Sequence, residues 1–300
     1  MQVPGPFEYE RATSVDHAVR LLDRLGPSAR IVAGGQSLLP MMKLRLVDVD
    51  YLIDINDLHG ELGYVRVDRN TKTSVVRIGA MTRHRELYEN ADLRRLLPIF
   101  HDAERVIADP PVRNRGTIGG SLCQADPSED LSAVCTSLEA TCVIRGPGGE
   151  RTVTMTEFYR GPYETAVGPA EVLTEIRIPL RPNGSSAFEK VGRRAGDWAI
   201  VSCGVAVWLD GGVITGARVG LAAVGPDTTG IPAVSRAVRG RAPSEDLYAE
   251  AAIAADNCAP VSDQRGSAAY KKSVGLVAVA TPATSAAATP ATTATATTHR

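Results

Sequence analysis

The chain has 300 residues, of which 44% are hydrophobic, and a formal net charge of −1 at pH 7. Its length exceeds that of a typical single domain, so we expect two or three modules, each with its own core. The balanced charge argues against nucleic-acid binding, and no apolar run is long enough to span a membrane. The N-terminus lacks the features of a secretory signal, so we expect a cytoplasmic location.

The first part of the chain predicts a small α/β unit over residues 1–60. Ser14 is the expected N-cap of a helix with apolar residues at helical spacing, and Gly26 and Pro27 end that helix. Strands are expected at 29–32 and 51–55 with a short helix around 38–46 between them, followed by a strand–turn–strand at 63–67 and 73–78.

The stretch 61–180 predicts a second unit that mixes helices and strands. The pattern over 82–108 is helical, and Pro98 indicates a first-turn position or a kink. The double proline at 110–111 disfavours a helix over 109–115. Further along we expect a helix at 128–138, a hairpin of strands 141–144 and 151–155, and a strand at 172–178.

A change of composition predicts a third, α+β unit over residues 184–280. Residues 179–186 are rich in Pro, Gly and Ser and are the expected linker. Beyond them, strands at 201–209 and 213–224 are joined by Asp210-Gly211-Gly212, a strong hairpin signal, and helices follow to about 280. Residues 281–300 are almost entirely Ala, Thr, Ser and Pro, a composition that predicts a disordered tail.

Two glycine turns are the most informative local motifs. Ala33–Ser37 (AGGQS) follows a short apolar strand, and Thr117–Ser121 (TIGGS) lies some eighty residues further on. Glycines let backbone approach a ligand closely and take positive φ angles, so that N–H groups can converge on an anion. A tight turn between packed elements is the alternative for either turn alone. Both turns end in serine and neither contains Lys or Arg, which together favours one permanently bound diphosphate.

Other common sites have no support in the sequence. There is no G-x-G-x-x-G after a strand, Walker A, H-E-x-x-H or G-x-S-x-G motif. The five cysteines contain no Cys-x-x-Cys pair and the five histidines are scattered, so we expect no metal site and no catalytic residue in this chain. Asp126 and Asp130 follow the second turn and could accept hydrogen bonds from sugar hydroxyls. A helix N-cap for Asp126 and a solvated first-turn carboxylate for Asp130 are the alternatives.

These two turns, the segment Asp126–Leu131 and Ser262–Tyr270 resemble the FAD-binding medium subunits of molybdenum hydroxylases, in the xanthine oxidase superfamily. The chain looks most like the carbon monoxide dehydrogenase type. The resemblance implies an α+β fold. Two FAD-binding subdomains of the vanillyl-alcohol-oxidase (PCMH) type would precede a C-terminal α+β domain.

The resemblance also implies which residues bind FAD, with its diphosphate between the two turns. Asp130 matches a ribityl- or ribose-binding aspartate, Leu173 a residue whose backbone meets the flavin ring, and Lys190 a lysine near that ring. Trp198 stands where an aromatic ring covers the flavin, with a core tryptophan as the alternative. The full expected set is Ala33, Gly34, Gly35, Gln36, Ser37, Thr117, Ile118, Gly119, Gly120, Ser121, Asp126, Asp130, Leu173, Lys190 and Trp198. Many relatives carry histidine where this chain has Gln36, and its amide can still donate.

What the resemblance implies about function is electron transfer. A large partner subunit with a molybdopterin cofactor would oxidise the substrate, a small partner with [2Fe–2S] clusters would relay electrons, and FAD here would pass them to a quinone or cytochrome. The expected assembly is a dimer of heterotrimers, and the complex could associate with the inner face of the membrane. Carbon monoxide is the favoured substrate, converted with water to CO2; aldehydes, nicotine-like compounds and xanthine are alternatives.

Two hypotheses of other classes stay open at this point. One is a stand-alone flavin reductase of the same fold. Such an enzyme would need a proton donor on the flavin face, and no Ser or Glu in the sequence is recognisable as one. The other is a flavin-free scaffold subunit that keeps only the fold.

Overall fold

The N-terminal sheet is parallel and small. The computed structural model describes residues 3–69, 74–225, 229–253 and 258–288. The first sheet has the order β1-β3-β2, formed by Glu8–Arg11, Tyr51–Asp54 and Ala29–Val32. Helix α1 (Val15–Leu25) packs its apolar side on this sheet, and Ser14 caps it by accepting from His17 N at 3.0 Å. The N-cap, helix and strand predictions here are confirmed, whereas β1 was not foreseen.

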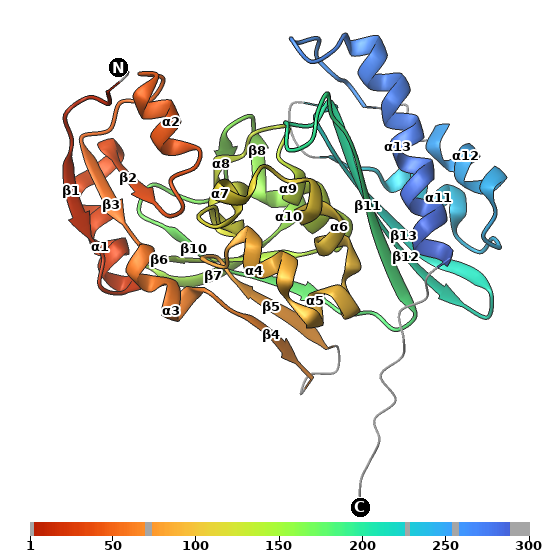
Figure 1. Ribbon diagram of the computed structural model, residues 1–300. Coiled ribbons are helices and arrows are strands. Elements are labelled where there is room, and N and C mark those ends of the chain that lie inside the picture. Colours follow the sequence, from red (N-terminus) through yellow and green to blue (C-terminus); the bar gives the residue numbers. More distant parts are fainter. Residues whose placement is uncertain (1–2, 70–73, 226–228, 254–257, 289–300) are drawn as a thin grey trace, which may run out of the picture.

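Short helices join the strands of this sheet and lead on to the next one. They are α2 (Leu38–Lys43) after β2, the 3-10 turns η1 (Gly26–Ser28) and η2 (Asn56–Leu58), and α3 (His59–Leu62). Helix α2 follows the first glycine turn directly, so the turn stands between β2 and α2 at the edge of the parallel sheet. Figure 1 shows this unit at one end of the molecule.

The second sheet is antiparallel, in the order β4-β5-β10-β6-β7. Its strands are β4 (Val65–Asp68), β5 (Val75–Gly79), β10 (Val172–Pro179), β6 (Thr141–Gly146) and β7 (Gly149–Thr154). The predicted hairpins are confirmed; part of the turn between β4 and β5 lies outside the described residues. A small ribbon of β8 (Tyr159–Gly161) and β9 (Glu164–Thr165) and the helix α10 (Met155–Phe158) follow β7.

Helices cover this sheet between β5 and β6. They are α4 (His84–Glu89), α5 (Ala91–Leu96), α6 (Pro98–Val106), α7 (Pro110–Arg113), α8 (Ile118–Gln124) and α9 (Asp130–Ser137). Pro98 begins α6, as predicted from its fixed φ and missing N–H. The expectation that 109–115 avoids helix is wrong for α7, because prolines fit a first turn and Asp109 accepts from Val112 N at 3.0 Å.

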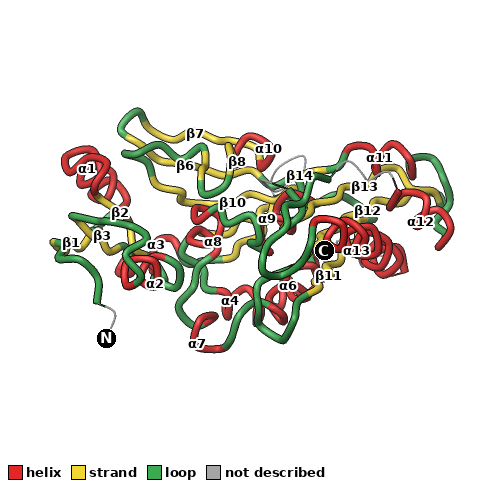
Figure 2. The backbone as a smooth tube through the Cα atoms, turned by 90° about the horizontal axis from the view of Figure 1, so that it is seen from above, coloured by secondary structure: helices red, strands yellow, loops and turns green. Residues whose placement is uncertain are grey.

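The third sheet has the order β11-β12-β13-β14 and is covered on both faces. Its strands are β11 (Gly184–Val191), β12 (Val201–Asp210), β13 (Val213–Ala222) and β14 (Thr229–Gly230). One face packs against α11 (Pro232–Val238), α12 (Glu245–Ile253) and α13 (Ala268–Ala288). The other packs against α9 and α6, as Figure 2 shows from above. A Cβ on Gly220 would lie 2.2 Å from Ala133 O, so this glycine lets α9 sit directly on the sheet.

Two predictions near the C-terminal unit need correction. Residues 184–186, expected in the linker, begin β11, so the connection from β10 is short. Helix α13 runs to Ala288, so the expected disorder is wrong for 281–288, and 289–300 lies outside the described residues. The Asp210-Gly211-Gly212 hairpin is confirmed, with positive φ at both glycines. We propose that the three sheets mark three subdomains, with boundaries near 60 and 180–184.

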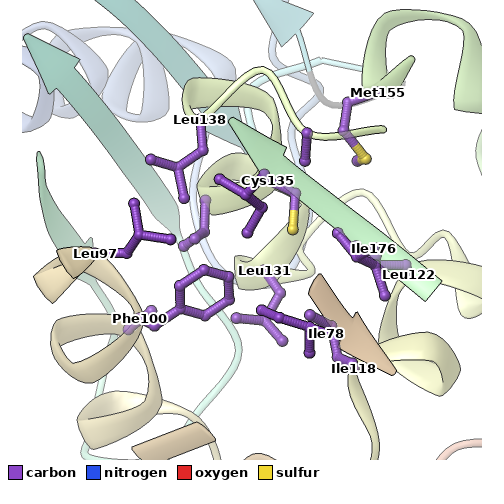
Figure 3. Packing of buried hydrophobic residues seen from close by; sticks show 14 of the residues in the cluster. Ile78, Leu97, Phe100, Ile118, Leu122, Leu131, Cys135, Leu138, Met155 and Ile176 are labelled. Carbon is purple, nitrogen blue, oxygen red and sulfur yellow. The ribbon is translucent and has the colours of Figure 1, made fainter. Parts of the chain in front are cut away.

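Helix α9 lies at the centre of the main core. Leu131 and Cys135 on this helix and Leu138 at its C-cap are at most 5% exposed and pack around Phe100 of α6 (Figure 3). The described residues contain no helix that is both long and apolar enough to cross a lipid bilayer.

Replacing Phe100 with Ala should lower the free energy of unfolding by about 3–5 kcal/mol, because its fully buried ring would leave a cavity. Leu46→Ala, at a side chain that is 69% exposed, should change it by less than about 0.5 kcal/mol. Urea unfolding followed by circular dichroism measures both. Equal effects of the two changes would contradict this account of the core.

Candidate cofactor-binding site

A single large cavity of about 1510 Å3 brings the predicted site residues together. Its walls come from the N-terminal unit, the helices of the second unit and the third sheet. The predicted residues that line it are Ala33, Gly34, Gly35, Gln36, Ser37, Thr117, Gly119, Gly120, Ser121, Asp130, Leu173, Lys190 and Trp198. Ile118 is fully buried, and Asp126 accepts from Ser128 N at 2.9 Å and Tyr163 Oη at 3.1 Å; neither lines the cavity.

The first glycine turn offers backbone donors. It follows β2, whose paired strand ends at the same edge, and Gly35 adopts φ +75°, which favours glycine. The backbone N–H groups of residues 34–37 donate no hydrogen bond to any other described residue. Unpaired N–H groups that face a cavity are costly unless a ligand or water accepts from them. This turn can therefore receive an anion.

The second glycine motif is the N-cap and first turn of helix α8, not the separate tight turn expected from the sequence, and its backbone donors are already engaged. The N–H groups of residues 118–121 donate to Thr82 O, Ala80 O, Thr117 Oγ1 and Thr117 O at 2.9–3.1 Å. The side-chain donor that this turn presents is the hydroxyl of Ser121, which lines the cavity. Gly119 is required by packing, since a Cβ there would lie 2.7 Å from Ala80 Cβ.

The first turn meets the backbone of residues 115–116, which lead into the second glycine motif. A Cβ on Gly34 would lie 2.3 Å from Arg115 O and 2.7 Å from Gly116 Cα, closer than any real contact. Side chains brace this contact from behind: Asn56 Nδ2 donates to Ala33 O at 2.7 Å, and Arg83 Nη2 donates to Asn56 Oδ1 at 3.0 Å. Arg83 also donates to Arg115 O. Sequence reasoning missed Asn56 and Arg83, since they belong to no motif.

At the far end, a buried ion pair joins two units. Lys190 Nζ of β11 lies 2.7 Å from Asp130 Oδ2 at the start of α9, and the two side chains are only 7% and 6% exposed. The other oxygen, Asp130 Oδ1, is buried with no hydrogen-bond partner among the described residues. The solvated-carboxylate alternative for Asp130 is therefore wrong. Burial raises the pKa of Asp130, and Lys190 opposes that rise.

Leu173 and Trp198 complete the lining at this end. Leu173 is buried on β10, beside a bulge in the pairing of β10 with β6. Trp198 is 42% exposed, so the core alternative from the sequence is wrong. Gln36 is also exposed, and its Nε2 donates to Gly34 O at 3.3 Å.

Further lining residues escaped sequence reasoning because they form no recognisable pattern. They are contributed by the stretches 105–110 and 167–172 and by His84, Glu129 and Tyr163, among others. These residues line the cavity because of how their helices, strands and loops pack together in the fold, which no local sequence pattern records. No group of three or more His, Cys, Asp or Glu side chains within the described ranges is placed to hold a metal ion.

Glu129, which lines the cavity, has a raised carboxyl pKa. Burial raises this pKa to about 7, and the adjacent Asp130 adds to the rise, while the N–H groups of Leu131 and Ser132 oppose it. Both N–H groups donate to Glu129, at 3.0 and 2.7 Å, so the side chain caps α9. Asp126, the N-cap alternative from the sequence, does not cap that helix.

Comparison with known proteins places almost the whole chain in two families. The family described as "FAD binding domain in molybdopterin dehydrogenase" matches residues 5–181, and "CO dehydrogenase flavoprotein C-terminal domain" matches residues 186–285. The carbon monoxide dehydrogenase medium chain of Hydrogenophaga pseudoflava is 40% identical over 276 residues, covering 91% of this chain and 94% of that one. The glyceraldehyde dehydrogenase medium chain of Sulfolobus acidocaldarius is 37% identical, covering 90% and 95%.

Comparison with solved structures gives the same result as the sequence comparison. A carbon monoxide dehydrogenase from Hydrogenophaga pseudoflava that lacks the Mo-pyranopterin moiety of its molybdenum cofactor contains a chain that superposes with a TM-score of 0.91. That chain is 40% identical, and the match covers 95% of this chain and 99% of that one.

Gly34→Ala should break the contact between the turns, at a cost of about 1–3 kcal/mol in stability, because its methyl group would meet rigid backbone. The purified variant should carry less flavin per chain, measured by absorbance. Gly60→Ala is the matched control, since a Cβ there meets nothing within 4 Å. Full flavin occupancy in Gly34→Ala would rule out the two-turn site.

Glu129→Gln should change how stability depends on pH. The pKa of Glu129 is raised in the folded chain from 4.5 to about 7, so its contribution to stability is complete below pH 4.5 and is lost as the pH rises to 7. The wild-type chain should thus lose up to about 3 kcal/mol relative to the variant over this range. Urea unfolding at several pH values measures the difference; parallel curves would contradict the assignment.

Proposed function

The chain belongs to the family of FAD-binding subunits of molybdenum hydroxylases, and we propose that its FAD lies in the cavity between the glycine turns and carries electrons for a multisubunit complex. The chain is thus an oxidoreductase subunit with an FAD-binding domain. The iron–sulfur and molybdenum cofactors belong to other subunits of such complexes. We assign no catalytic residue to this chain.

The observation that carries the site proposal is the row of unpaired N–H groups at residues 34–37, which face a large cavity. Neutral donors suit a diphosphate that stays bound, because nothing in the turn has to stabilise a transferring phosphoryl group. The close approach of Gly34 to residues 115–116 holds the first turn next to the segment that leads into Ser121, and both line one cavity. The FAD diphosphate would accept hydrogen bonds from both turns.

The remaining predicted residues fit the rest of FAD. Asp130 Oδ1 lacks a partner, so it can accept from a ribityl or ribose hydroxyl, and Lys190 holds this carboxylate in place. The backbone of Leu173 would meet the flavin ring, and the exposed Trp198 would cover one of its faces. When bound, FAD supplies the capacity to take up electrons and deliver them to a different acceptor.

The proposal extends to the complex, on the strength of the relatives. We propose a large molybdopterin subunit and a small [2Fe–2S] subunit as partners, in a dimer of heterotrimers, with a quinone or cytochrome as external acceptor. Carbon monoxide is the favoured substrate, since relatives named for it are 40% and 39% identical over most of the chain. The glyceraldehyde relative, at 37%, keeps an aldehyde as the second candidate.

The full chain, purified alone and in its complex, tests this function. If the proposal is right, the isolated chain binds FAD and shows flavin absorption. It should oxidise neither carbon monoxide nor aldehydes. The complex should oxidise one of them and elute at the size of a hexamer. Substrate oxidation by the chain alone would favour the stand-alone reductase, and a flavin-free active complex would favour the scaffold hypothesis.

A further inference from the structure

A serine, a histidine and a glutamate form a chain of hydrogen bonds behind the second glycine turn. Ser121 Oγ lies 3.0 Å from His84 Nε2, and His84 Nδ1 lies 3.0 Å from both carboxylate oxygens of Glu104. His84 and Glu104 are 3% and 0% exposed, whereas Ser121 is part-buried and lines the cavity. The FAD contacts proposed above give no role to His84 or Glu104.

The imidazole ring is held in one position. His84 begins α4, and its backbone N–H donates to Gly116 O at 3.1 Å, which ties it to the second turn. A Cβ on Gly116 would lie 2.7 Å from His84 Cδ2, so the ring packs directly against the turn's backbone. Glu104, on α6, closes the other side. The imidazole can therefore gain or lose a proton, but its orientation is fixed by packing.

The direction of the Ser121 proton depends on the charge of His84. A neutral imidazole with its proton on Nδ1 accepts the serine O–H at Nε2, as in nucleophile activation. The hydroxyl proton then points away from the cavity. An imidazolium instead donates from Nε2 to Ser121 Oγ, which leaves the serine proton free to point into the cavity. Only the second arrangement offers an anion a donor.

The surroundings of His84 favour the charged form. Burial acts to lower the pKa of His84, but the Glu104 carboxylate 3.0 Å away reverses this, and the pKa is raised overall. The charged groups around the pair are Glu104 on α6, Glu129 and Asp130 at the start of α9, Arg113 on α7, and Lys190 of β11 through Asp130.

We propose that His84, hydrogen-bonded to Glu104, is a positioning residue that turns the Ser121 hydroxyl into a donor for the diphosphate of FAD. This rests on the proposed function, since it requires FAD in the cavity. It explains how the second turn contributes although its backbone N–H groups are engaged. It also supplies a positive charge behind two turns that contain neither Lys nor Arg.

The affinity for FAD should then depend on pH through His84. The protonated form binds the anion better, so the dissociation constant should be low and level in acid and rise as the pH passes the pKa of His84. His84→Phe removes the donor and should weaken binding about 10- to 100-fold. His84→Gln keeps a neutral N–H donor, so it should restore part of the affinity without the pH dependence. Glu104→Gln should move the loss of affinity to lower pH.

The measurement uses the full chain in its complex, stripped of flavin and titrated with FAD from pH 6 to 9.5. The 31P shift of the bound diphosphate, followed over the same range in a Glu129→Gln background because the pKa of Glu129 is about 7, should titrate when His84 is present and stay level in His84→Gln. His59→Phe is the control: its Nε2 also lies 3.0 Å from a carboxylate, Glu86, but its side chain is 37% exposed and does not line the cavity. Thermal unfolding of each flavin-free variant checks its fold; if His84→Phe does not fold, the two conservative variants decide.

A double-mutant cycle isolates the route through serine. In a Ser121→Ala background, His84→Phe should have little further effect on FAD affinity. The inference would be overturned if His84→Phe weakened FAD binding equally with and without Ser121. It would also be overturned if the wild type and His84→Gln showed the same dependence of FAD affinity on pH. Labelling of Ser121 by a fluorophosphonate in the flavin-free chain would also overturn it, because His84 would then act as a base. A wild type that binds no FAD at any pH would instead refute the proposed function.

Discussion

The contact between the backbones at Gly34 and residues 115–116 is the constraint on which the site depends. The two turns belong to different sheets and helices, and they can meet only because Gly34 has no side chain. Asn56 and Arg83 hold the contact with hydrogen bonds to backbone carbonyls on both sides. Without this approach the free N–H groups of the first turn and the hydroxyl of the second would not share one cavity.

The site combines neutral donors with buried, paired charged groups. Residues 34–37, whose N–H groups are unpaired, and Ser121 line the cavity, and His84, which also borders it, forms a buried pair with Glu104. Lys190 and Asp130 repeat this arrangement at the far end, with one residue from the third sheet and one from α9. Buried charges are costly unless paired, so each pair is most stable when its elements are docked. Assembly of the fold and completion of the site are therefore coupled.

The packing of the third sheet against α9 brings the charged residues Lys190 and Asp130 together. Glycines at 204 and 220 let α9 lie directly against β12 and β13, and α9 carries Asp130 at its first turn. Lys190 reaches that carboxylate from β11 of the same sheet. The relatives match this chain over nearly its whole length, which agrees with a site that needs all three sheets.

The sequence by itself determined the features that depend on neighbouring residues. The Ser14 cap, Pro98 at a helix start, the Asp210-Gly211-Gly212 hairpin and the first glycine turn are local, because cap and turn conformations restrict which residues can occupy them. The resemblance carried by the turns also indicated the family. Local composition misled at residues 110–113 and 281–288, where helices form.

Only the tertiary structure decided which distant residues meet. His84 and Glu104 are separated by a helix, and Lys190 and Asp130 by sixty residues, so no spacing rule connects them. The tertiary structure also showed that the two glycine motifs differ. The backbone N–H groups of residues 34–37 are unpaired among the described residues, whereas those of residues 118–121 donate hydrogen bonds to residues 80, 82 and 117. Hydrogen-bond partners and burial depend on packing between segments, and a local pattern does not record that packing.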